Sequence, residues 1–136
     1  MRWIAVFGVL MLGLAACERA PENPLLGRWQ SDEAATLIEA RDAGGLSEQQ
    51  LQQLKDEKVF GRLVADIDDS EIVFEYEGKR EPSAYRILKV EKPFVDIELF
   101  NNATSQYETT RIEAHDDRLW VPSSLASFRE VFVRID

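Results

Sequence analysis

The sequence is poor in the residues that usually build covalent, metal or nucleic-acid sites. Its 136 residues include one cysteine, Cys17, and one histidine, His115. A single thiol cannot form an intramolecular bridge, so a disulfide framework is excluded. The 16 basic residues face 25 acidic ones, which gives a net charge of −9, and they form no basic run. A surface of this sign repels nucleic acid and anionic lipid, so we expect no nucleic-acid partner.

The chain also lacks the local patterns of common catalytic and cofactor sites. It has no Gly-rich phosphate-binding loop, and Ser123-Ser124 lacks the Gly-x-Ser-x-Gly context that exposes a nucleophile. His115-Asp116-Asp117 offers potential metal ligands, but these are ordinary turn residues. A metal site needs three or four converging ligands. We therefore expect no catalytic residues, no cofactor and no metal: the protein is predicted not to be an enzyme.

What the chain does have is an N-terminal apolar segment typical of a secretory signal peptide. Arg2 gives it a short basic head, and residues 3–14 carry no charged or strongly polar side chain. At ~1.5 Å rise per residue, this apolar core is too short to span ~30 Å of hydrocarbon as a permanent transmembrane helix. We therefore predict that residues 1–16 are a signal peptide.

The end of this segment, Leu14-Ala15-Ala16-Cys17, resembles the lipobox of bacterial lipoproteins. The resemblance implies a palmitate-type diacyl group on the Cys17 thiol, cleavage before Cys17 and acylation of the new amine. One acyl chain anchors a protein marginally, whereas two or three hold it firmly in a membrane. In enterobacterial lipoproteins an Asp after the cysteine favours the inner membrane. Glu18 at that position therefore points to the periplasmic side of the outer membrane.

A polar tether is expected to join this anchor to one small domain. Residues 17–24 contain two prolines and no apolar side chain larger than alanine after Cys17. The stretch from Glu18 to Pro24 reaches about 20 Å when extended. From Cys17 onward the chain has 15 basic and 25 acidic residues, a net charge of −10, so membrane attachment depends on the lipid. Residues 25–136 are enough for one hydrophobic core.

Two helices are predicted near the start of the domain. Ser31-Asp32 caps a helix that ends at Gly44-Gly45, and Ser47 with Gln50 forms a capping box for a second helix. The apolar positions expected to pack on a core are Leu37, Ile38, Leu51 and Leu54.

The remaining pattern has a period of two, which is typical of strands. In residues 70–77 the apolar Ile72, Phe74 and Tyr76 lie on one face, and acidic residues lie on the other. A phase change between Ile87 and Leu88 indicates a β-bulge or burial on both faces. Closure removes exposed strand edges, so we expect an antiparallel meander of about eight strands that forms a small barrel or half-barrel. The predicted strands are residues 25–30, 63–67, 70–77, 85–90, 94–100, 106–114, 118–121 and 128–135.

Gly27-Arg28-Trp29 matches the Gly-x-Trp element of lipocalins and their calycin relatives. In that superfamily a basic side chain from the last strand packs over the tryptophan and closes the barrel floor. The resemblance implies this role for Arg129 first and for Arg134 second. The two predicted helices resemble the helical lid of intracellular fatty-acid-binding proteins. The chain thus resembles a small bacterial lipoprotein with a lipocalin-like domain, although it lacks the disulfide and C-terminal helix common in secreted lipocalins.

Two functions remain open at this point. Phe74, Tyr76, Tyr85 and Trp120 are candidates to line an apolar cavity that binds a hydrophobic or amphipathic small molecule. The same four side chains equally suit a filled barrel that acts as a structural module and docks on another protein of the envelope. A continuous internal cavity favours the first function, whereas a filled interior with an exposed apolar patch favours the second.

The anchor hypothesis makes a direct prediction for Cys17. Replacing Cys17 with Ser removes the thiol that would carry the diacyl group, so metabolic labelling with palmitate should disappear and the protein should become soluble. Equal membrane fractionation of the C17S protein and the unchanged protein would contradict the anchor hypothesis.

Overall fold

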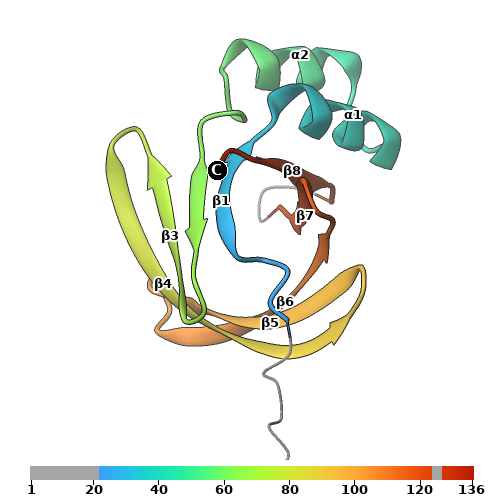
Figure 1. The fold of residues 1–136 in the computed structure, drawn as a ribbon. Coiled ribbons are helices and arrows are strands. Elements are labelled where there is room, and N and C mark those ends of the chain that lie inside the picture. The colour runs from blue at the N-terminus through green and yellow to red at the C-terminus, as the bar shows by residue number, and fades with distance from the viewer. Residues whose placement is uncertain (1–21, 124–126) are drawn as a thin grey trace, which may run out of the picture.

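The computed structural model describes residues 22–123 and 127–136, so the predicted signal peptide and Cys17 lie outside the described residues. The chain forms a closed barrel of eight antiparallel strands in sequence order, with two helices after the first strand (Figure 1). The prediction of a mainly β domain of this layout is confirmed. The elements are β1 (Gly27–Ser31), α1 (Glu33–Ala43), α2 (Glu48–Asp56), β2 (Val64–Ile67), β3 (Glu71–Tyr76), β4 (Lys79–Glu91), β5 (Phe94–Asn101), β6 (Gln106–Ala114), β7 (Arg118–Pro122) and β8 (Arg129–Arg134).

Strand β4 is longer than predicted because the β3–β4 hairpin has a two-residue turn. Tyr76 pairs with Lys79, and both turn residues, Glu77 and Gly78, have a positive φ, as a tight hairpin turn requires. Pairing therefore continues through the polar start of β4, which the predicted strand over residues 85–90 did not include. The register between β4 and β5 shifts after Ile87, which confirms the predicted bulge.

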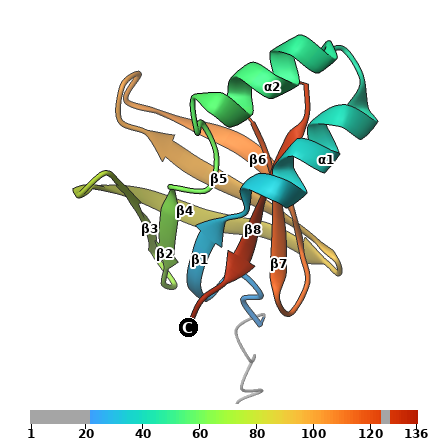
Figure 2. The ribbon, with the colours of Figure 1, turned by 90° about the horizontal axis from the view of Figure 1, so that it is seen from above.

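The helix caps are as predicted. The Asp32 side chain accepts a hydrogen bond from the Ala35 backbone, and Ser47 and Gln50 form the capping box of α2. The prediction that Ile38 packs on the core is wrong, because Ile38 is 57% exposed. The buried α1 side chains are Thr36 and Ala40, whose small size allows the helix backbone to approach β8 closely. Figure 2 shows α1 lying across the end of β8, with α2 beside it.

The buried Trp29 ring seals one end of the barrel. Its Nε1 donates to the Leu25 carbonyl oxygen at 2.9 Å, and the Arg134 guanidinium lies 4.2 Å from its ring centroid. Arg134 also donates to the carbonyl oxygens of Leu26 and Asp116. A Cβ on Gly27, which has a φ of +132°, would overlap Nη1 of Arg134. The Gly-x-Trp element thus provides both the ring and the space for the guanidinium that covers it.

The prediction that Arg129 covers Trp29 is wrong, and the second choice, Arg134, makes this contact. Arg129 lies on the outer face of β8, where its guanidinium is 6.0 Å from the Trp120 ring and forms ion pairs with Glu39 and Glu113. The aliphatic residues beside Arg129 in the sequence suggested the barrel interior. Of these residues Val131 is instead buried under α1, Val133 is half-buried and Ile135 is exposed, because α1 covers part of the outer face of β8.

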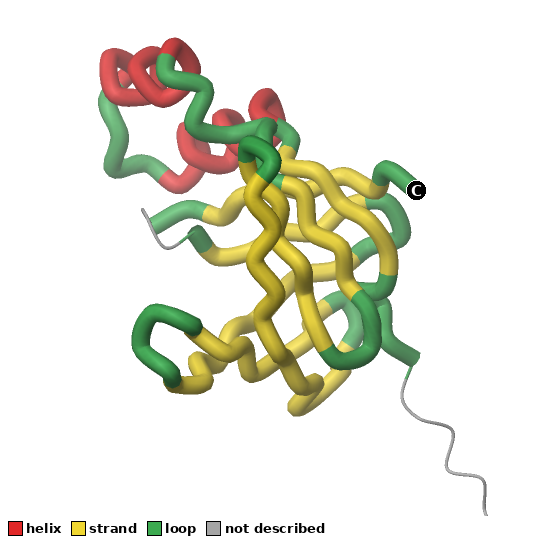
Figure 3. The backbone as a smooth tube through the Cα atoms, turned by 90° about the vertical axis from the view of Figure 1, so that its left-hand side faces the viewer, coloured by secondary structure: helices red, strands yellow, loops and turns green. Residues whose placement is uncertain are grey.

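The sealed end lies at the start of β1, and α1 follows directly after the end of β1. Figure 3 shows the helices on one side of the strands and the start of the described chain on the other. Residues 22–26 meet the barrel at the sealed end, where Asn23, predicted to belong to the tether, donates from Nδ2 to the Tyr85 hydroxyl at 2.8 Å. Within residues 22–123 and 127–136, no helix combines the length and the apolar content that crossing a bilayer requires. The start of the described chain is therefore fixed to the end of the barrel remote from α1 and α2.

The contact of Arg134 with Trp29 predicts that two glycine substitutions lower the free energy of unfolding by different amounts. Gly27→Ala should destabilise the fold by roughly 2–3 kcal/mol, since it combines a strained φ with displacement of Arg134. Gly78→Ala is the matched control, because its φ is also positive but open space surrounds it, and it should cost only about 1 kcal/mol. Urea denaturation measures both; equal costs would show that Gly27 makes no room for Arg134.

Candidate functional site

The barrel interior contains a small apolar cavity of about 50 Å³. Ten of its eleven lining residues are apolar, the exception being Thr110. By the volume that one water-sized group occupies, such a cavity holds about three to five groups of that size. The lining residues are Ala65, Ile67, Ile72, Phe74, Ile97, Leu99, Thr110, Ile112, Leu119, Val121 and Phe132. The interior is therefore neither a roomy ligand chamber nor completely filled.

The cavity extends from Ala65, which pairs with Trp29, to Phe74, Leu99 and Val121; we call the part of the barrel around these last three residues the open half. Its lining residues Phe74, Leu99 and Val121 are only half-buried, whereas Trp29 at the sealed end is fully buried. The β6–β7 ladder has only two residue pairs, at the C-terminal end of β6. Thr110 and Val121, which line the cavity from these two strands, lie beyond that short ladder. The open half is thus less tightly closed than the sealed end.

Glu130 is the half-buried acidic residue on the inner face of the open half, whereas Glu81 and Glu108, which pair with Phe74 and Leu99, are exposed. Glu130 pairs with Val121 and lies two residues from Phe132 on β8, and both of these side chains line the cavity. Its Oε2 atom is buried and has no hydrogen-bond partner among the described residues. Burial raises the pKa of the Glu130 carboxyl, and a hydrogen bond from the Ser31 hydroxyl opposes the rise. An acceptor thus lies unpaired beside an apolar cavity.

Ser31 is itself held in place at the end of β1. Its side chain is buried, and its Oγ accepts a hydrogen bond from the Gly61 backbone at 3.0 Å. Its backbone pairs with Phe132, which places Ser31 on the same inner face as Glu130. The open half therefore combines an apolar wall with a polar edge formed by Ser31 and Glu130.

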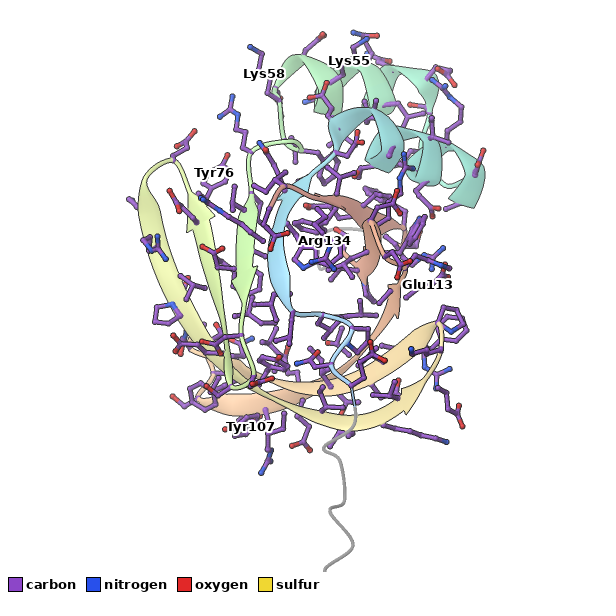
Figure 4. The ribbon with its side chains drawn as sticks, viewed as in Figure 1. Lys55, Lys58, Tyr76, Tyr107, Glu113 and Arg134 are labelled. Atoms are coloured by element: carbon purple, nitrogen blue, oxygen red, sulfur yellow. The ribbon has the colours of Figure 1, made fainter. Side chains whose placement is uncertain are left out.

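Of the four predicted ligand-binding residues, only Phe74 lines the cavity. Tyr76 lies near the tip of the β3–β4 hairpin and is 41% exposed (Figure 4). Tyr85 is buried in the barrel core, where its hydroxyl donates to the Asp68 carbonyl oxygen, and burial raises its pKa. Trp120 lies on the outer face and donates from Nε1 to Glu39 at 3.0 Å. The structure therefore does not bring these four residues together in one site.

A polar cluster on the outer face holds α1 against the barrel. Arg129 lies between Glu39 of α1 and Glu113 of β6, with its nearest carboxylate oxygen, on Glu113, at 3.0 Å. The hydrogen bond with His115, together with Arg129, lowers the pKa of the Glu113 carboxyl. Figure 4 shows Glu113 outside the ring of strands and Arg134 within it. Across the described ranges no group of three or more potential ligands is arranged to hold a metal ion.

The sequence analysis missed both Glu130 and Ser31. The inner face of β8 was assigned from the aliphatic neighbours of Arg129, and Ser31 was predicted only as part of a helix cap. Had Arg134 been chosen as the residue over Trp29, the period of two would have placed Phe132 and Glu130 on the same inner face.

The buried carboxyl predicts how stability depends on pH. Because the folded pKa of Glu130 is raised, the unfolded chain ionises first, and the fold loses stability as pH rises through the folded value. Glu130→Gln should therefore raise the free energy of unfolding at pH 7 by roughly 1 kcal/mol, with the gain vanishing well below pH 4. Denaturant titrations across pH measure this. The exposed Glu91, substituted by Gln, should change stability by less than about 0.5 kcal/mol. A gain for E130Q that did not vary with pH would contradict the buried charge.

No family model, no curated protein and no solved structure matches this chain. What the barrel does is therefore inferred from its own cavity, its unpaired carboxyl and the position of its sealed end.

Proposed function

We propose that this protein is a lipid-anchored, non-enzymatic component of the bacterial envelope that binds a small amphipathic molecule in the open half of its barrel. The observation that carries the proposal is the apolar cavity of about 50 Å³ with the polar edge formed by Ser31 and Glu130. An apolar wall with a few placed polar groups is the usual composition of a small-molecule site. The volume admits only a short chain or one side of a small ring.

The lipocalin resemblance supports this proposal. The contact that it implies between a basic residue of the last strand and Trp29 is present, made by Arg134. It joins the first strand to the last, so the barrel closes around its interior instead of opening into a flat sheet. A closed barrel of eight strands has an interior just wide enough for side chains or for one small ligand.

The position of the sealed end supports the envelope role. The described chain begins at that end, and α1 and α2 lie at the other (Figure 3). An anchor on Cys17 would therefore attach the sealed end to the membrane, and the open half would face the periplasm. In this orientation the cavity is reached from water and not from the bilayer.

A second candidate function is docking on another envelope protein. A groove of about 270 Å³ runs beside α2, between Leu46, Leu54, Phe60 and Phe128. This groove is larger than the barrel cavity and lies outside the barrel. The groove favours docking on another protein. A test of small-molecule binding in the barrel must therefore use substitutions that leave the groove unchanged.

Filling the cavity tests the proposed function. Ala65 lines the cavity, and Ala65→Leu adds three carbon groups where about three to five water-sized groups fit. Ala84 is exposed on the outer side of β4, so Ala84→Leu is the matched control. Native mass spectrometry of the chain from Glu18 onward, secreted to its own periplasm, should show a small molecule on the unchanged protein and on A84L but not on A65L. Absence of a small molecule from all three proteins, or its retention on A65L, would contradict binding in the cavity.

A further inference from the structure

Burial of the Glu130 Oε2 atom destabilises the fold, because no hydrogen bond from the described residues replaces the water that this atom loses. A buried acceptor without a donor loses its hydrogen bonds to water without replacement, and the loss is greater when the acceptor is charged. Among the described residues, Glu130 Oε2 is the one buried side-chain nitrogen or oxygen atom without a hydrogen-bond partner. Ser31 offers a single hydroxyl to this side chain. The Oε2 atom of the carboxylate thus receives no hydrogen bond from residues 22–123 or 127–136.

No cationic side chain of the described residues forms an ion pair with Glu130, although two arginines lie on the same strand. Arg129 is on the opposite face of β8 and pairs with Glu39 and Glu113. Arg134 is on the inner face but lies over Trp29 at the sealed end. Both guanidiniums are held by their own partners, so the positive charge that would match Glu130 is not supplied by β8.

We propose that the ligand supplies this charge, and that the open half binds a small cationic amine. Its ammonium group donates to Oε2 of Glu130, and its apolar part enters the cavity between Phe74, Val121 and Phe132. The proposal rests on the proposed function and narrows its ligand class. The small volume limits the apolar part to a short alkyl chain or a small ring.

The charges on the molecule agree with this ligand class. An amine bears both the donor and the positive charge that the carboxylate lacks, and hydrogen bonds to ionised groups are about twice as strong as neutral ones. A fatty carboxylate of the same length would place two like charges together in a poorly solvated site. The net charge of −9 adds a long-range attraction for cations and a repulsion for anions.

Three five-carbon probes separate the role of Glu130 from that of the cavity. Pentylammonium, pentan-1-ol and pentanoate share one apolar chain and differ in the charge of the head group. Each is titrated at pH 7 into the chain from Glu18 onward, which contains every strand and helix of the closed barrel. Binding is followed by the amide NMR shifts of Val121 and Phe132. Glu130→Gln is compared with Glu91→Gln, which removes an exposed carboxylate that faces Lys89.

Pentylammonium should bind roughly ten- to hundredfold more tightly than pentan-1-ol, and pentanoate should bind least. In E130Q, pentylammonium should bind at most about threefold more tightly than pentan-1-ol, and the affinity for pentan-1-ol should not change. In E91Q, pentylammonium should keep its full advantage of roughly ten- to hundredfold over pentan-1-ol. Equal binding of pentylammonium and pentan-1-ol, or a preference that survives in E130Q, would overturn the amine assignment while the cavity proposal stands. Failure of all three probes to shift Val121 and Phe132 would overturn both.

Discussion

The contact between Arg134 and Trp29 is the interaction on which the rest of the barrel depends. It brings the last strand to the first at the same register position, so the ladder between β1 and β8 closes the sheet. The guanidinium fits only because Gly27 has no side chain. A cation over an indole face contributes about 0.5–2 kcal/mol, and here it also covers a fully buried ring from solvent.

Closure at this end decides where a ligand can be held. The Trp29 ring fills the interior at the sealed end, and the cavity beside it reaches from Ala65, the β2 partner of Trp29, to Val121, which pairs with Glu130. Arg134 and Glu130 thus both lie on the inner face of β8, but their surroundings differ. Arg134 has an aromatic ring and two carbonyl oxygens as partners, whereas Glu130 keeps one oxygen unpaired. The first arrangement stabilises the fold, and the second is destabilising unless something else binds there.

Local signals predicted the secondary structure well. The capping box of Ser47 and Gln50 is a property of four consecutive residues, and the strand Gln106–Ala114 has the predicted bounds. The polar start of β4 was missed because its pairing follows from the turn at Glu77 and Gly78, not from its own alternation. Such pairing depends on tertiary context more than on strand propensity.

The site was harder to predict because several strands are covered on both faces. Trp120 and Val131 face α1 outside the barrel, yet their apolar character is the same as that of an inner face. The sequence alone therefore left two possible orientations for β8. Choosing between them needed the position of α1, which depends on the small side chains of Thr36 and Ala40 and not on an apolar stripe.

The central claim is that the open half contains a buried, unpaired carboxyl beside an apolar cavity. Titration of the Glu130 carboxyl carbon by NMR, in the ligand-free protein, tests it most directly. The account predicts a midpoint clearly above the ordinary pKa of a glutamate side chain, and a fall in that midpoint when pentylammonium is added. A midpoint at that ordinary value, unchanged by pentylammonium, would contradict it.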